Sequence, residues 1–104
     1  MVAAVVARLS ELRSAVGHLA HVNGRDYAVW LVGTDVVYVL DNDCLHLGGP
    51  LAEGMIDDAC VVCPWHGWTY DLATGQRRTA LGEVAGVGSH RTWVDGDEVW
   101  ADLP

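Results

Sequence analysis

Positive charge is scarce in this sequence of 104 residues. Lysine is absent, and six arginines are outnumbered by fourteen aspartates and glutamates, so the formal net charge at pH 7 is −8. Nucleic acids and anionic membranes bind basic surfaces, and we therefore expect neither as a partner. An acidic surface instead favours docking against a basic patch on another protein.

Long apolar runs are also missing, and cysteine is rare. No stretch approaches the ~20 apolar residues that span a bilayer. The apolar segment at residues 1–7 is short and has no basic residues before it, so we expect no signal peptide. Three cysteines, an odd number, exclude a disulfide-rich scaffold and favour a reducing compartment. These absences predict a soluble, cytoplasmic protein.

The chain shows no internal repeat, linker or low-complexity segment, and its length suits one domain over residues 1–104. Short apolar and β-branched segments alternate with glycine-containing turns, and Asn23-Gly24 is a strong hairpin signal. The expected strands are residues 2–9, 17–22, 27–32, 36–40, 60–62, 70–72, 76–78, 91–94 and 98–101, with a helical turn at 10–13 capped by Ser10. This pattern predicts an all-β antiparallel sandwich or barrel.

Four candidate metal ligands lie in two boxes in the middle of the chain. The first box holds Cys44 and His46, and the second holds Cys63 and His66. One thiolate and one imidazole from each box form a ligand set of mixed softness that suits a metal centre. Glycine and proline surround both boxes, which lets the backbone turn tightly beside an inorganic core.

Two cysteines and two histidines are also a ligand set for structural zinc. Zinc fingers usually pair cysteine with cysteine and histidine with histidine at their short spacings. Each box here pairs one cysteine with one histidine. This mixed pairing favours an iron–sulfur cluster, with zinc as the alternative.

The two boxes resemble those of Rieske proteins, and specifically those of the small Rieske-type ferredoxins. The matching residues are Cys44, His46, Gly48, Gly49, Pro50, Leu51, Gly54, Cys63, Pro64, Trp65, His66, Gly67 and Tyr70. The resemblance implies one Rieske-type [2Fe–2S] cluster, with Cys44 and Cys63 on one iron and His46 and His66 on the other. It also implies a Rieske-type antiparallel β fold in which the two ligand loops form a small cluster-binding tip.

The same resemblance implies a one-electron carrier rather than an enzyme, because the redox chemistry belongs to the cluster. We see no nucleotide motif, non-haem iron triad or substrate-pocket signature. The carrier would be a monomer that takes electrons from an NAD(P)H-dependent flavoprotein ferredoxin reductase to a terminal, aromatic-ring-hydroxylating oxygenase. The alternative is the Rieske-like small subunit of an assimilatory nitrite reductase. A third possibility, the N-terminal domain of an oxygenase, is disfavoured by the length of the chain.

Residues beside the ligands predict a low reduction potential. The resemblance implies that high-potential relatives carry a disulfide and a serine near the cluster, where this chain has Gly49, Trp65 and Trp68. Tyr70 keeps a phenol that can donate to a ligand sulfur. Fewer hydrogen bonds to sulfur stabilise the added electron less, so we expect a midpoint roughly below 0 mV.

Three further residues near the boxes have two interpretations each. Cys60 forms a Cys-x2-Cys pair with Cys63, which suggests a redox thiol, but its apolar strand favours a small buried hydrophobe. Trp65 either covers the cluster or packs in the core. For Trp68, packing is favoured.

Overall fold

A computed structural model of the protein describes residues 1–45, 48–65 and 67–104. These residues form three sheets, in which every strand pairs antiparallel with its neighbours. The first sheet has the order β1 (Val2–Arg8), β12 (Glu98–Leu103), β11 (Thr92–Asp95). The second has the order β10 (Ser89–His90), β4 (Val36–Asp41), β3 (Arg25–Val32), β2 (His18–Val22). The third has the order β5 (Met55–Asp57), β6 (Cys60–Val62), β7 (Thr69–Asp71), β8 (Arg77–Thr79), β9 (Gly82–Val84).

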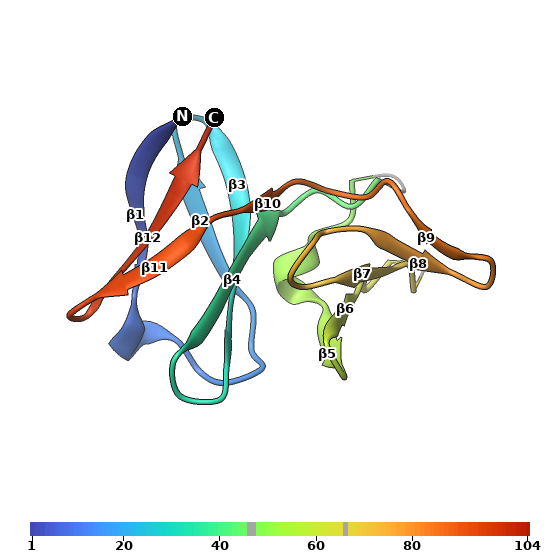
Figure 1. The fold of residues 1–104 in the computed structure, drawn as a ribbon, viewed down its shortest axis with the longest axis horizontal. Helices are drawn as coiled ribbons and strands as arrows, with labels where there is room; N and C mark the ends of the chain where they lie inside the picture. The colour runs from blue at the N-terminus through green and yellow to red at the C-terminus, as the bar shows by residue number, and fades with distance from the viewer. Residues whose placement is uncertain (46–47, 66) are drawn as a thin grey trace.

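The sheets form two bodies along the long axis of the molecule (Figure 1). The first two sheets, with both chain ends, make up the base, defined as residues 1–41 and 89–104. The third sheet belongs to the tip, defined as residues 42–88, which leaves the base after β4 and returns in β10. The expected all-β architecture with a tip is therefore confirmed.

Helical structure in the described ranges is limited to two 3-10 turns, η1 (Leu9–Glu11) and η2 (Leu51–Glu53). No helix in these ranges is long and apolar enough to cross a membrane. The turn expected at residues 10–13 begins one residue earlier, and the prediction that Ser10 caps it is wrong. Ser10 instead donates its N–H and its hydroxyl to the Asp97 carboxylate, at 2.8 and 2.7 Å.

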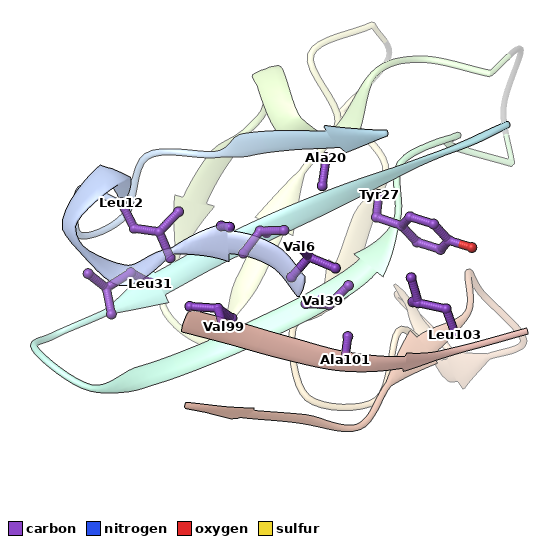
Figure 2. Packing of buried hydrophobic residues seen from close by; sticks show 11 residues of the cluster. Val6, Leu12, Ala20, Tyr27, Leu31, Val39, Val99, Ala101 and Leu103 are labelled. Carbon is purple, nitrogen blue, oxygen red and sulfur yellow. The ribbon is translucent and has the colours of Figure 1, made fainter. Parts of the chain in front are cut away.

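The central strand β3 serves two cores, because it is covered on both faces. Its odd-numbered residues, Tyr27, Val29 and Leu31, pack in the core between the two base sheets (Figure 2). Its even-numbered residues, Ala28 and Trp30, pack in the core of the tip. Side chains alternate faces along a strand, so one strand can join two hydrophobic cores. This strand therefore holds the tip against the base.

Two adjacent residues at the end of β4 fix the junction between base and tip. The buried Asn42 donates its N–H to the Asp26 carbonyl at 3.1 Å, and its side-chain oxygen accepts the Ala52 N–H at 2.8 Å. The Asp41 carboxylate accepts the Gly88 N–H at 3.1 Å and lies 2.7 Å from His90 Nε2. The segment that enters the tip after β4 and the segment that returns to β10 are thus both held by hydrogen bonds.

Most expected strands are present, but β5, β9 and β10 were not predicted. They have two or three residues each, too few for an alternating pattern to be recognised, whereas the equally short β6, β7 and β8 lie beside the second box and a glycine-containing turn that marked them. The hairpin at Asn23-Gly24 is confirmed, with positive φ at both turn residues, 51° and 79°. Positive φ at both central residues is typical of the type I′ turn, whose backbone twist matches that of the paired strands.

We expect Trp30→Ala to lower the free energy of unfolding by about 3–5 kcal/mol, because it empties a fully buried site in the tip core. Denaturant unfolding of the variant measures this loss. Leu81→Ala is the control, since Leu81 is 100% exposed and its truncation should change stability by less than ~0.5 kcal/mol. Equal stability of the two variants would contradict the role assigned to β3.

Candidate metal centre

The two ligand boxes fold into loops with the same hydrogen-bond frame. In each loop the cysteine N–H donates to the carbonyl five residues later, and the N–H four residues later donates back to the cysteine carbonyl. These distances are 2.8 and 2.9 Å in loop 44–49, and 2.8 and 3.1 Å in loop 63–68. The fourth position after each cysteine is a glycine with positive φ, Gly48 at 69° and Gly67 at 73°. A side chain there would be strained, so glycine permits both turns.

This shared frame was missed in the sequence. The signal was present, because Gly48 and Gly67 each follow their cysteine by four residues. The two boxes do not look alike in the sequence, because the histidine is two residues after the cysteine in the first box and three residues after it in the second.

The structure brings two of the four predicted ligands together. Cys44 and Cys63 are each 2% exposed and belong to the same buried cluster of the tip. Neither forms a disulfide bond among the described residues. His46 and His66, the other two predicted ligands, lie outside the described residues.

The first loop lies directly against the second. A Cβ added at Gly49 would lie 2.8 Å from the Cys63 sulfur and 3.1 Å from Cγ of Trp65. Such distances are too short for carbon, so only glycine lets the backbone of the first loop approach the second cysteine. Two buried thiols held in touching loops fit the thiolate half of a [2Fe–2S] site.

Tyr70 connects the β7 strand to the first loop. Its hydroxyl oxygen lies 3.1 Å from the Cys44 sulfur and accepts the Leu45 N–H at 3.1 Å. The hydroxyl proton is therefore available to the Cys44 sulfur, which would act only as an acceptor if it were a thiolate. Burial raises the pKa of Tyr70, and the hydrogen bond to Cys44 raises it further. The phenol thus stays protonated and keeps its donor.

The hairpin that carries Tyr70 is held by Asp71. Its carboxylate accepts the N–H groups of Ala73 and Thr74 at 2.9 and 3.1 Å, and a guanidinium N–H of Arg78 at 3.1 Å. Burial alone would raise the pKa of Asp71, but these hydrogen bonds to the charged form outweigh it and leave the pKa lowered. The ionised carboxylate therefore fixes the turn between β7 and β8.

Sequence reasoning also missed Arg77. Its guanidinium carbon lies 3.3 Å from the centroid of a Trp68 ring, in a cation–π stack beside the second loop. The hairpin expected around residues 73–75 would place Arg78 opposite Tyr70, whereas the observed register places Arg77 there. A strand partner of Tyr70 is diagonal to Trp68, within reach of a long side chain.

The structure distinguishes the interpretations of the other neighbours. Cys60 is 2% exposed in β6, and burial raises the pKa of its thiol, as expected for a small buried hydrophobe. Trp65 is 53% exposed, so it is not a core residue. Trp68 is half-buried and packs against the tip core, as favoured from the sequence.

We expect Tyr70→Phe to lower the midpoint potential of the cluster-loaded protein, because the thiolate loses a donor that favours the reduced state. If the hydrogen bond stabilises the reduced cluster over the oxidised one by on the order of 1 kcal/mol, its loss lowers the midpoint potential by ~40 mV for one electron. Protein-film voltammetry measures the shift. Tyr27→Phe, in the core of the base, should leave the midpoint unchanged. Equal midpoints for wild type and Tyr70→Phe would show that the hydroxyl does not act on the cluster.

Comparison with known proteins identifies this pair of loops. The family model of the Rieske [2Fe–2S] domain matches residues 3–87. Aminopyrrolnitrin oxygenase PrnD of Pseudomonas fluorescens is 40% identical over 67 residues, which cover 64% of this chain. That match covers 18% of the oxygenase, so the chain spans less than a fifth of the length of this relative.

Solved structures of similar length share the whole fold. The ferredoxin of carbazole 1,9a-dioxygenase from Nocardioides aromaticivorans is 30% identical, with a TM-score of 0.85 and 97% of both chains covered. A complex of reduced oxygenase and oxidised ferredoxin in carbazole 1,9a-dioxygenase contains a chain that is 25% identical, with a TM-score of 0.80 and 95% and 91% of the chains covered. A putative nitrite reductase small subunit has a TM-score of 0.83 at 19% identity, with 99% and 100% covered, which shows the fold alone.

The family match covers most of the chain and includes both loops. The cofactor of this family is a [2Fe–2S] cluster, and the buried cysteine pair fits it. The zinc alternative is therefore set aside. The chain belongs to the Rieske [2Fe–2S] domain family.

Proposed function

We propose that this protein is a one-electron carrier that delivers electrons to a terminal oxygenase of the aromatic-ring-hydroxylating type. The observation that carries the proposal is the match to a dioxygenase ferredoxin over 97% of both chains. The carrier role requires only that the protein hold the cluster, tune it and present it to partners.

In this proposal Cys44 and Cys63 hold one iron, and His46 and His66 hold the other. The cluster, when bound, supplies the one-electron chemistry. The surrounding residues exclude water, because Leu51, Val61 and Tyr70 are fully buried beside the two cysteines. A dry, packed surround lets the donor of Tyr70 act strongly on the ligand sulfur.

The remaining features of the proposal concern the setting of the carrier. We infer a single domain over residues 1–104 that acts as a cytoplasmic monomer and takes electrons from a flavoprotein ferredoxin reductase. The nitrite reductase alternative is supported by fold alone, whereas the ferredoxin reading has higher sequence identity at similar length. Reduction of the purified protein by NADH and a flavoprotein ferredoxin reductase tests this reading, and failure with several such reductases would favour the alternative.

The tip carries a groove beside the second loop that suits a protein partner. Its wall includes Cys63, Pro64 and the side chain of Met55, which is 75% exposed on the edge strand β5. Glu53 and Asp57 also line the groove. An apolar groove with acidic residues beside a ligand cysteine complements a partner surface that has an apolar centre and basic residues.

The ligand assignment predicts different effects for the three cysteines. We expect Cys44→Ser and Cys63→Ser to abolish normal cluster assembly, because serine is a harder and poorer ligand for this iron. His46→Ala should also lose the cluster or leave it incomplete. Cys60→Ala is the control and should retain it, since Cys60 packs as a buried apolar residue. Iron analysis and EPR of the reduced proteins measure this; a cluster kept in Cys44→Ser and lost in Cys60→Ala would refute the assignment.

The groove predicts electrostatic docking that weakens with salt. Electron delivery from a flavoprotein ferredoxin reductase should slow as ionic strength rises, because exposed charges become screened. Combined replacement of Glu53, Asp57 and Asp58 by their amides should slow delivery at low salt and flatten its salt dependence. The matched control neutralises Glu98, Asp35 and Asp95 in the base, with the same change of net charge. Stopped-flow measurements of the reduction rate compare the two triple variants with the wild type. Equal effects of the two variants would exclude the groove as the docking site.

A further inference from the structure

The stack of Arg77 on Trp68 places a positive charge at the cluster side of the tip sheet. Arg77 lies opposite Tyr70 in the β7–β8 pair, and opposed residues project from the same face of a sheet. Tyr70 reaches the Cys44 sulfur from that face. The next residue, Arg78, is exposed and bonds to Asp71 at 3.1 Å. The two adjacent arginines therefore lie in different environments.

Trp68 links this cation to the ligand loop. Its carbonyl accepts the N–H of Cys63 at 2.8 Å, and its side chain packs against the core that contains both cysteines. The guanidinium carbon lies 3.3 Å from the ring centroid, so the cation is separated from the second loop by one side chain. Stacking on an indole face also fixes the guanidinium in place.

The charge of Arg77 is unusual in the tip. The sequence of the tip contains two basic residues, Arg77 and Arg78, and six acidic ones: Asp43, Glu53, Asp57, Asp58, Asp71 and Glu83. Arg78 is bonded to Asp71, whereas Arg77 has no carboxylate partner among the described residues. Its Nε is buried and also lacks a hydrogen-bond partner within the described ranges. Arg77 therefore supplies an uncompensated positive charge in an acidic region.

We propose that Arg77 raises the reduction potential of the cluster and that Trp68 positions it to do so. A Rieske site with two thiolates is neutral when both irons are ferric and carries one negative charge after accepting an electron. A fixed nearby cation stabilises the reduced state more than the oxidised state. Because Arg77 is half-buried, salt screens its effect less than that of a surface charge. This charge partly offsets the low potential expected from the missing hydrogen-bond donors.

The proposal depends on the cluster and not on the identity of any partner, so voltammetry of the isolated, cluster-loaded protein tests it. Arg77→Gln should lower the midpoint potential, and Arg77→Lys, which keeps the charge without the planar stack, should lower it less. Arg91→Gln is the control, because it removes an equal charge and Arg91 lies 5.3 Å over Trp93 in the base, which reproduces the arginine–tryptophan pair away from the loops. This control should leave the midpoint close to the wild-type value.

Trp68→Leu separates positioning from charge alone. Trp68→Leu should lower the midpoint potential, because the guanidinium of Arg77 is no longer held in place. In the double variant, Arg77→Gln should lower the midpoint potential less than it does in the wild-type background. Iron content and the melting temperature of every variant identify any that have lost the site. The proposal is overturned if Arg77→Gln, with a full cluster, shows the wild-type midpoint, or if Arg77→Lys and Arg77→Gln shift it equally. The second result would assign the effect to packing.

Discussion

The approach of Gly49 to the Cys63 sulfur is the contact on which the arrangement of the tip depends. At this point backbone from the first loop touches Cys63, a predicted ligand in the second loop, with no room for a Cβ between them. Each loop closes itself through its own pair of backbone hydrogen bonds, and this contact sets one loop against the other. The packing of the two cysteines in one core, and the reach of Tyr70 to Cys44, both require that spacing.

The base supports this arrangement through a shared strand and a hydrogen-bonded junction. The strand β3 contributes to both hydrophobic cores, and Asn42 forms hydrogen bonds through its main chain and its side-chain oxygen at the entry to the tip. A buried polar residue with such bonds is costly to displace, because each lost partner would leave a desolvated group. The fold therefore separates two tasks: the base provides most of the strand pairing, and the tip provides the chemistry.

The sequence predicted the fold class, the main strands and the Rieske-type boxes because these depend on local signals. Alternating apolar residues, the Asn23-Gly24 turn and the cysteine boxes can all be recognised in short windows. Arg77 and the contact at Gly49 could not be found in this way. Each depends on which residues lie opposite one another across a sheet or between two loops, and strands of three residues set that register through tertiary packing.

The hydrogen bonds at the junction make the tip a self-contained insert in the base. The Asp41 N–H donates to the Gly88 carbonyl at 2.9 Å, and Ser89 pairs with Leu40, so the segment between them begins and ends at neighbouring positions of one antiparallel pair. A segment whose ends already meet adds little closure entropy to the host sheet. The two ends of the tip can therefore stay fixed in the base while the length of the segment between them varies. Its sequence can change only where the contacts with Ala28 and Trp30 of β3 are kept, because these base residues are part of the tip core.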